Sequence, residues 1–295
     1  MSAFAESDFN ADRYDRSRPS YPSDFYRILD QYHKGQRHLL VDVGCGPGTA
    51  TLQMAKELRE FDKIIGTDIS DAMVKKAQQS QSTVKHERLS FALAPSDDFS
   101  FLGPVENDRQ VVDMITAVEC VHWFDYQNFQ ASIAANLRSN GTIAIWGYAD
   151  AVFIDYPDLD DILDDVAYGS DQLGPYWEQP GRKILRTMLA NWSFNLDKFT
   201  DIREVNLKAT SLRTTSVSEI QPQPLVIVKE MTVADYAAYV KTWSAYHAWY
   251  KKFGDSKPDV TEEFVKRVNS TYPELTANST VKVAWNTFYK FARRI

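Results

Sequence analysis

Three glycines and two aspartates stand in an order that suits a nucleoside ligand. The stretch VDVGCGPGTAT runs from apolar residues into Gly44, Gly46 and Gly48. Asp42 precedes these glycines, and Asp68 ends the next apolar stretch. Glycines that follow a buried strand let the backbone approach a ligand closely, and a carboxylate at the end of the next strand accepts hydrogen bonds from the hydroxyls of a ribose. The pattern therefore predicts a turn that binds a nucleoside.

The spacing of the glycines separates two classes of nucleotide ligand. A dinucleotide fingerprint reads G-x-G-x-x-G, whereas this turn reads G-x-G-x-G and carries Thr49 at the third fingerprint position. Asp42 would repel a pyrophosphate and attract an amine. S-adenosylmethionine joins an adenosine to a sulfonium, an ammonium and a carboxylate, so it fits these residues better than a nicotinamide cofactor. An NAD-dependent oxidoreductase is the less favoured alternative.

An adenine pocket is expected at the ends of the following strands. In the stretch LAPSDDFSF, Ser96 or Asp97 could bond the exocyclic amine of the base. Ile69 and Met73 could cover the faces of the ring. Glu119, in the later stretch AVECVHWF, joins these residues as a candidate cofactor ligand.

Composition excludes several other functions. The 295 residues carry a net charge of −7, and basic residues cluster only in pairs, which disfavours a nucleic-acid partner. Two cysteines favour a reducing compartment, and neither a signal core nor an apolar run of membrane-spanning length is present. We therefore expect a cytoplasmic protein with no membrane partner. The five histidines lack helical zinc-site spacing and no C-x-x-C occurs, so no metal is expected.

The candidate residues must be positioned by alternating strands and helices over residues 38–148. Five nearly apolar stretches, HLLVDVG, DKIIGTDIS, RLSFALA, VVDMITAVEC and GTIAIWGY, predict strands. Amphipathic stretches between them predict helices, one of which we expect to have Ser70 as its N-cap and another to end at Asn140-Gly141. This alternation predicts an α/β fold with a doubly wound, mostly parallel sheet.

The rest of the chain is expected to complete a single domain, 1–295. Residues 1–37 would form an N-terminal helical segment over the cofactor. Residues 149–255 are acidic and aromatic, and predict a helical substrate cap that includes a sixth strand in DIREVNLKA and one long helix over 231–252. Residues 256–295 would add a C-terminal helix and a last strand.

The quoted motifs resemble those of a known family. VDVGCGPGTAT, GTDIS, APSDDFSF and AVECVHWF are similar to successive motifs of the class I S-adenosylmethionine-dependent methyltransferases. HWF and RPSYP resemble the subgroup that esterifies small carboxylic acids, most closely the trans-aconitate 3-methyltransferases. The resemblance implies a Rossmann-like sheet of seven strands in the order 3-2-1-4-5-7-6, with the last strand antiparallel. It also implies cofactor contacts by Asp42, Gly44, Gly46 and Asp68.

The resemblance implies methyl transfer to a carboxylate of a polycarboxylic acid such as trans-aconitate or isopropylmalate. A carboxylate is ionised at neutral pH, so alignment and removal of water should suffice, and His122 is the only catalytic candidate. Cations that could hold carboxylates and aromatic residues that could exclude water are the candidate substrate ligands. They are Tyr14, Arg18, His122, Trp146, Tyr148, Tyr176, Trp177, Arg182, Tyr246 and His247.

Other acceptors remain open at this stage. A sterol, a quinone or a xenobiotic would be expected in a purely apolar pocket, whereas a polar pocket that contains arginine favours an acid. A nucleic-acid base is disfavoured because ECVHWF stands where adenine methyltransferases commonly carry an N/D-P-P-Y/F motif. A non-catalytic binding protein is disfavoured by the intact acids and glycines of the cofactor motifs.

Overall fold

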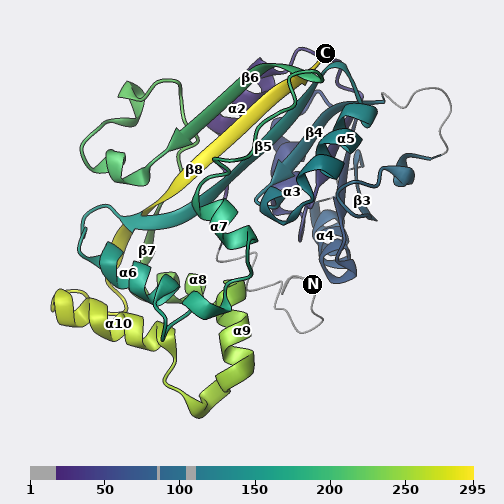
Figure 1. Cartoon of the computed structure of the whole chain (residues 1–295). Coiled ribbons are helices and arrows are strands. Elements are labelled where there is room, and N and C mark those ends of the chain that lie inside the picture. Colours follow the sequence, from purple (N-terminus) through teal and green to yellow (C-terminus); the bar gives the residue numbers. More distant parts are fainter. Residues whose placement is uncertain (1–17, 85–86, 104–110) are drawn as a thin grey trace.

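The computed structural model describes residues 18–84, 87–103 and 111–295 (Figure 1). Tyr14 lies outside the described residues, as do all of residues 1–17 of the expected N-terminal segment 1–37. The strands are β1 (Leu39–Val43), β2 (Lys63–Asp68), β3 (Leu89–Leu93), β4 (Val112–Val118), β5 (Leu137–Phe153), β6 (Phe199–Leu207), β7 (Val228–Thr232) and β8 (Thr280–Arg294).

Nine α-helices and six short 3-10 helices are found in the described part of the chain. The α-helices are α2 (Ser23–Tyr32), α3 (Thr49–Glu57), α4 (Asp71–Val84), α5 (Tyr126–Asn136), α6 (Leu159–Tyr168), α7 (Gly181–Arg186), α8 (Val233–Val240), α9 (Ser244–Phe253) and α10 (Val260–Thr271). The 3-10 helices are η2 (Ser100–Leu102), η3 (Val121–Trp123), η4 (Gly174–Tyr176), η5 (Ala209–Arg213), η6 (Val217–Glu219) and η7 (Gly254–Ser256).

The central sheet has eight strands in the order β3-β2-β1-β4-β5-β8-β6, and β7 pairs with β8. Strands β1 to β5 run parallel to one another, whereas β8 is antiparallel to β5, β6 and β7. The fold class and the strand order expected from the resemblance are confirmed, with β8 in the place of the seventh strand. Strand β7 is an additional short strand.

Strands β1 and β4 lie in the middle of the sheet, and their burial agrees with this position. All seven residues of β4 are buried, and four of the five residues of β1 are buried. Parallel strands must be covered on both faces, which is why they read as apolar runs. In Figure 1, α3, α4 and α5 lie around this part of the sheet, whereas α6, α8, α9 and α10 gather beyond the ends of the long strands β5 and β8.

Two expected boundaries are wrong. The stretch 231–252 is not one helix, because Thr232 ends β7 and caps the N-terminus of α8 by accepting a hydrogen bond from the backbone N–H of Asp235 at 3.0 Å. Helix α8 then ends at Val240 and α9 begins at Ser244. Both helices bury aromatic residues, so the apolar period continued across the break and concealed it.

The pair Asn140-Gly141 does not end a helix, because α5 already stops at Asn136. Asn140 has a φ of +63° and lies in an irregular part of β5, where Val112 pairs with Leu137 and Met114 pairs with Thr142. The turn residues therefore mark a bulge within a strand. The expected N-cap at Ser70 is confirmed, since its hydroxyl accepts a hydrogen bond from the backbone N–H of Met73 at 3.4 Å.

Candidate active site

The glycine-rich turn joins β1 to α3 in a conformation that favours glycine. Gly44 has a φ of +68° and Gly46 a φ of +55°. A Cβ atom on Gly44 would lie 2.8 Å from Sγ of Cys120, whereas a Cβ on Gly46 would meet no described atom within 4 Å. Gly44 therefore allows the turn to pack against the end of β4, and Gly46 leaves the backbone accessible to a ligand.

Asp68 fixes this turn from the end of β2. Its Oδ2 accepts a hydrogen bond from the backbone N–H of Gly46 at 2.9 Å, and its Oδ1 accepts one from Ser70 at 2.8 Å. Burial raises the pKa of Asp68, and these backbone hydrogen bonds oppose that shift. The carboxylate lies in the wall of a cavity, where a ligand hydroxyl can reach it.

The cavity beside the turn has a volume of about 440 Å³ and is formed by the carboxyl ends of β1, β2, β3 and β4. Nucleotides bind at this edge of open α/β sheets. Seven of the predicted cofactor residues line it: Gly44, Gly46, Asp68, Ile69, Met73, Ser96 and Glu119. We call it the cofactor cavity.

Three predicted cofactor residues lie elsewhere. Asp42 is fully buried beneath the turn, where its carboxylate accepts hydrogen bonds from the hydroxyls of Thr51 at 2.6 Å and Thr116 at 2.7 Å. Burial raises the pKa of Asp42 to about 6. Gly48 faces Phe91 and is not part of the cavity wall, and neither is the exposed Asp97. Asp42 therefore supports the turn from below, not by contact with a ligand in the cavity.

A second cavity of about 310 Å³ adjoins the first and lies among β5, α6, α7, α8 and the start of α9. Arg18, Glu119, Trp123 and Tyr148 line both cavities. Because these residues belong to both walls, a group bound in one cavity can approach a group bound in the other. We call the second space the acceptor cavity.

Arg18 occupies the junction of the two cavities. Its Nη1 donates a hydrogen bond to the hydroxyl of Tyr148 at 3.2 Å, and its Nη2 donates one to the backbone carbonyl of Thr242 at 3.2 Å. The guanidinium also lies 5.4 Å from the centre of the Tyr239 ring. These contacts confine a positive charge to the point where the cavities meet.

Glu119 comes directly after β4 and has a φ of +58°, which is uncommon for a residue with a side chain. Its Oε2 accepts a hydrogen bond from the backbone N–H of Tyr148 at 2.8 Å. Burial raises the pKa of Glu119 to about 7, opposed by that hydrogen bond and by Arg18 and Arg182. The junction therefore holds a carboxyl group that titrates near neutral pH.

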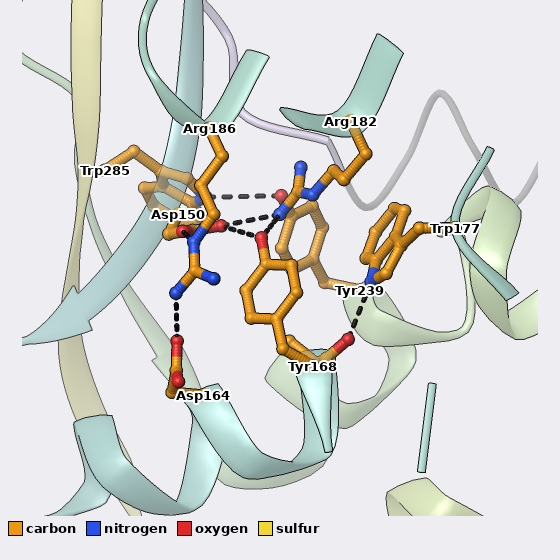
Figure 2. A network of polar contacts seen from close by, with 9 residues as sticks. Asp150, Asp164, Tyr168, Trp177, Arg182, Arg186, Tyr239 and Trp285 are labelled. Atoms are coloured by element: carbon orange, nitrogen blue, oxygen red, sulfur yellow. Dashed lines mark hydrogen bonds and ion pairs between the residues drawn. The ribbon is translucent and has the colours of Figure 1, made fainter. Parts of the chain in front are cut away.

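Arg182 lines the acceptor cavity as part of an ion-pair network (Figure 2). Its Nη2 contacts Oδ1 of Asp150 at 2.5 Å and the hydroxyl of Tyr168, and its guanidinium lies 4.1 Å from the centre of the Trp177 ring. Arg186 contacts the other oxygen of Asp150 at 3.0 Å. Asp150 therefore neutralises part of the positive charge that the sequence suggested for the substrate.

His122 lies in η3 and lines the acceptor cavity. Burial lowers its pKa to about 3, and the nearby Arg182 and Arg18 add to the shift. Its ring centre is 4.8 Å from that of Trp123. His122 is therefore a neutral imidazole at physiological pH and supplies no positive charge to an anion.

Four predicted substrate residues line neither cavity. Trp146 is fully buried against Phe25, with ring centres 5.2 Å apart. Tyr246 donates a hydrogen bond to Asp259 at 2.8 Å, and Tyr176 packs on Phe253 in the η4–α9 contact. The fourth residue, His247, is half-buried on α9. Tyr148, Trp177, Arg18, Arg182 and His122 do line the acceptor cavity.

The structure adds residues to the acceptor cavity that the sequence did not single out as site residues. They are Trp123, Asp150, Tyr168, Tyr236, Tyr239 and Asn286. Tyr236 and Tyr239 lie on one face of α8, a spacing that the core of a protein also produces. The hydroxyl of Tyr236 is fully buried and has no hydrogen-bond partner among the described residues. Sequence alone gives no signal for such an unsatisfied group.

Among the residues that the structure describes, none of the helices has both the length and the apolar character of a membrane-spanning segment. No group of three or more His, Cys, Asp or Glu side chains in the same part of the chain could hold a metal ion.

Comparisons with known proteins agree with this architecture. Residues 40–141 match the family model described as a methyltransferase domain. The chain is 29% identical to CRG1, a probable S-adenosylmethionine-dependent methyltransferase of Saccharomyces cerevisiae, over 99% of this chain and 98% of that protein. It is 26% identical to a proposed methyltransferase of Dictyostelium discoideum, over 88% of this chain and 84% of that protein.

A solved structure shares the fold. A proposed type II methyltransferase from Anaeromyxobacter dehalogenans aligns with a TM-score of 0.68 at 22% identity, over 94% of this chain and 97% of that one. The strand order, the turn after β1 and the match over residues 40–141 agree with the nearly full-length similarity to CRG1. Residues 40–141 therefore match a methyltransferase domain, and the chain as a whole is similar to a protein described as an S-adenosylmethionine-dependent methyltransferase.

Proposed function

We propose that this chain transfers the sulfonium methyl group of S-adenosylmethionine to a carboxylate of a small polycarboxylic acid such as trans-aconitate. The observation that carries the proposal is the position of Arg18 at the junction of the cofactor and acceptor cavities. A guanidinium has five N–H donors and binds carboxylates with charge-assisted hydrogen bonds. A carboxylate beside Arg18 would lie next to the methyl donor.

The cofactor is assigned to the cavity beside the glycine turn. Asp68 would accept the ribose hydroxyls, and the backbone at Gly44 and Gly46 would pass under the methionine part. Ile69 and Met73 would cover the adenine ring, and Ser96 would contact its edge. All six residues line the same cavity, which supports this arrangement.

The reaction is a single in-line displacement. A carboxylate oxygen attacks the methyl carbon, a C–O bond forms, and the C–S bond breaks with its electron pair left on sulfur. A neutral methyl ester and S-adenosylhomocysteine result, and no proton has to move. The aromatic lining, which includes Trp123, Trp177, Tyr239 and Trp243, supports a mechanism that depends on alignment and the exclusion of water.

A second candidate is methylation of a hydroxyl on an uncharged small molecule. The observation in its favour is the number of acids in the acceptor cavity: Asp150, Asp160, Asp161 and Asp164 all line it. Asp150 is paired with Arg182, and Asp160 with Arg213 at 2.5 Å, so part of this negative charge is neutralised. The pocket contains two arginines, Arg18 and Arg182, which favours the acid as acceptor.

Incubation with methyl-labelled S-adenosylmethionine and a panel of acceptors tests the proposal. We expect a base-labile ester with trans-aconitate or isopropylmalate, and no product with phenols or sterols. Arg18→Leu should raise KM for the acid at least about tenfold, because a charge-assisted hydrogen bond contributes about 1.5–3 kcal/mol. Arg27→Leu, on the exposed face of α2, is the matched control. A base-stable ether with a hydroxyl acceptor, and no ester, would refute the proposal.

A further inference from the structure

We propose that Glu119 carries a proton in the acceptor complex and donates it in a hydrogen bond to the acceptor carboxylate, so that binding of the acid takes up a proton. This inference rests on the proposed function and specifies how the site accommodates an anionic acceptor. It assigns to Glu119 a contact with the acceptor, in addition to the cofactor contact expected from the sequence.

The backbone directs the Glu119 side chain toward the junction. A non-glycine residue at a φ of +58° has an uncommon and strained backbone conformation, which is often retained at functional sites. The backbone N–H of Glu119 donates to the carbonyl of Trp146 at 2.9 Å, and its Oε2 accepts from Tyr148 at 2.8 Å. Both contacts come from β5, so the carboxyl group is held at a fixed position in the wall of both cavities.

Gly147 provides the space that this position requires. A Cβ atom on Gly147 would lie 2.2 Å from Oε2 of Glu119 and 2.9 Å from Cζ of Phe288. A side chain at this point of β5 would displace the carboxyl group. The site therefore combines Glu119, which has a left-handed backbone conformation at the end of β4, with Gly147 on the neighbouring strand β5.

The second carboxyl oxygen is the group available to the acceptor. Oε2 accepts a hydrogen bond from the backbone N–H of Tyr148, and no described residue donates a hydrogen bond to Oε1. Arg18 and Arg182 are the cations that act on the carboxyl, and the neighbouring Cys120 thiol is affected by its charge, whereas His122 and Asp150 line the acceptor cavity together with both arginines. Of these, the two arginines favour the ionised form of Glu119, and His122 is neutral.

An acceptor carboxylate changes this balance. Burial already raises the pKa of Glu119 to about 7, and an anion bound at Arg18 would place a second negative charge beside it. Two carboxyl groups that share a site bind one proton between them, because both cannot ionise at small separation. The proton stays on Glu119 during transfer. The ester that forms is neutral, so it no longer favours the protonated form, and Glu119 can release its proton when the product leaves.

Calorimetric titration of trans-aconitate into the protein loaded with S-adenosylhomocysteine measures this proton. Titrations in two buffers of different ionisation enthalpy give the number of protons taken up. We expect uptake of about half to one proton near pH 7.5 and almost none near pH 6, where Glu119 is already protonated in the free protein. Uptake that is zero at both pH values would overturn the inference.

Variants at position 119 distinguish whether Glu119 acts as a hydrogen-bond donor or as a general base. Glu119→Gln keeps a neutral N–H donor, so it should bind the acid within about threefold of wild type, turn over, and take up no proton. Glu119→Ala should bind the acid at least about tenfold more weakly. Glu230→Gln, an exposed acid on β7, should behave as wild type.

Two further outcomes are decisive. A Glu119→Gln protein that binds the acid but has lost turnover would assign Glu119 as a general base and overturn the inference, while the proposed function would stand. If wild-type protein neither binds nor methylates any acid of the panel, the proposed function itself fails, and the inference fails with it.

Discussion

Asp68 accepts two backbone hydrogen bonds from the segments that surround the cofactor cavity. Asp68→Ala removes both of these bonds and the proposed ribose ligand. We therefore expect affinity for S-adenosylhomocysteine to fall at least about tenfold, which corresponds to about 1.4 kcal/mol. Affinity for the acid should change much less in calorimetric titrations. Asp71→Ala, on the exposed first turn of α4, is the control, and an equal loss of both ligands would contradict the ribose role.

His122 should make the stability of the protein depend on pH. Its pKa is lowered to about 3 in the folded protein, whereas an unfolded chain binds the proton near pH 6.5. Folding stability is therefore lost as the pH falls below about 6.5, by about 2 kcal/mol at pH 5. The free energy of unfolding of His122→Gln should fall less between pH 7 and pH 5, by about that amount, in urea titrations. An identical fall in both proteins would show that His122 is protonated in the folded state.

Individual site residues differ in how far the sequence could predict them. Asp68 and Gly46 line the cofactor cavity as expected, because a turn after a buried strand has few conformations. Asp42 was predicted by the same reasoning, but its carboxylate is buried and accepts hydrogen bonds from two threonine hydroxyls. Trp146 was expected at the substrate and is in the core, since sequence does not show which element covers an aromatic residue.

At the scale of elements, the turn between β1 and α3 contains two glycines that differ in how much space a side chain would have. Gly44→Ala combines a positive φ with a Cβ atom 2.8 Å from Cys120, so it should lower the free energy of unfolding by about 2–4 kcal/mol. Gly46→Ala meets no described atom and should cost only about 1–2 kcal/mol. Chemical denaturation measures both values.

The same pair should separate stability from ligand binding. Gly46 lines the cofactor cavity, so Gly46→Ala should weaken S-adenosylhomocysteine binding by more than its small effect on stability would suggest. Equal stability of the two variants would contradict the packing of Gly44 against the end of β4.

The strands of the parallel sheet were easier to predict than the elements around the acceptor cavity. The apolar runs of β1, β2, β4 and β5 could be recognised because both faces of a parallel sheet are buried. The break between α8 and α9 could not, because the aromatic residues on both sides keep a helical period. Strand β7 has only one buried residue, so its hydropathy gives no strand signal.

At the scale of the molecule, Asp150 joins three elements around the acceptor cavity (Figure 2). It lies on β5, contacts Arg182 and Arg186 of α7, and accepts a hydrogen bond from Tyr168 of α6 at 2.5 Å. Asp150→Asn leaves the two guanidinium groups without their shared anion. We therefore expect KM for the acceptor to rise about tenfold, because Arg182 and α7 lose their fixed position.

Binding in the cofactor cavity should not change in Asp150→Asn. Affinity for S-adenosylhomocysteine should stay within about twofold of wild type, because Asp150 does not line the cofactor cavity. Asp165→Asn breaks an ion pair with Arg267 on the outer side of α6 and is the matched control for steady-state kinetics. A similar loss of both affinities would show that the two cavities are not energetically separate.

Ile69 is 72% exposed, although it lies in the wall of the cofactor cavity beside Asp68. If adenine covers this side chain, as the proposed arrangement requires, apolar surface leaves water when the cofactor binds. The association should then show a negative change in heat capacity, and its enthalpy should become more favourable as the temperature rises.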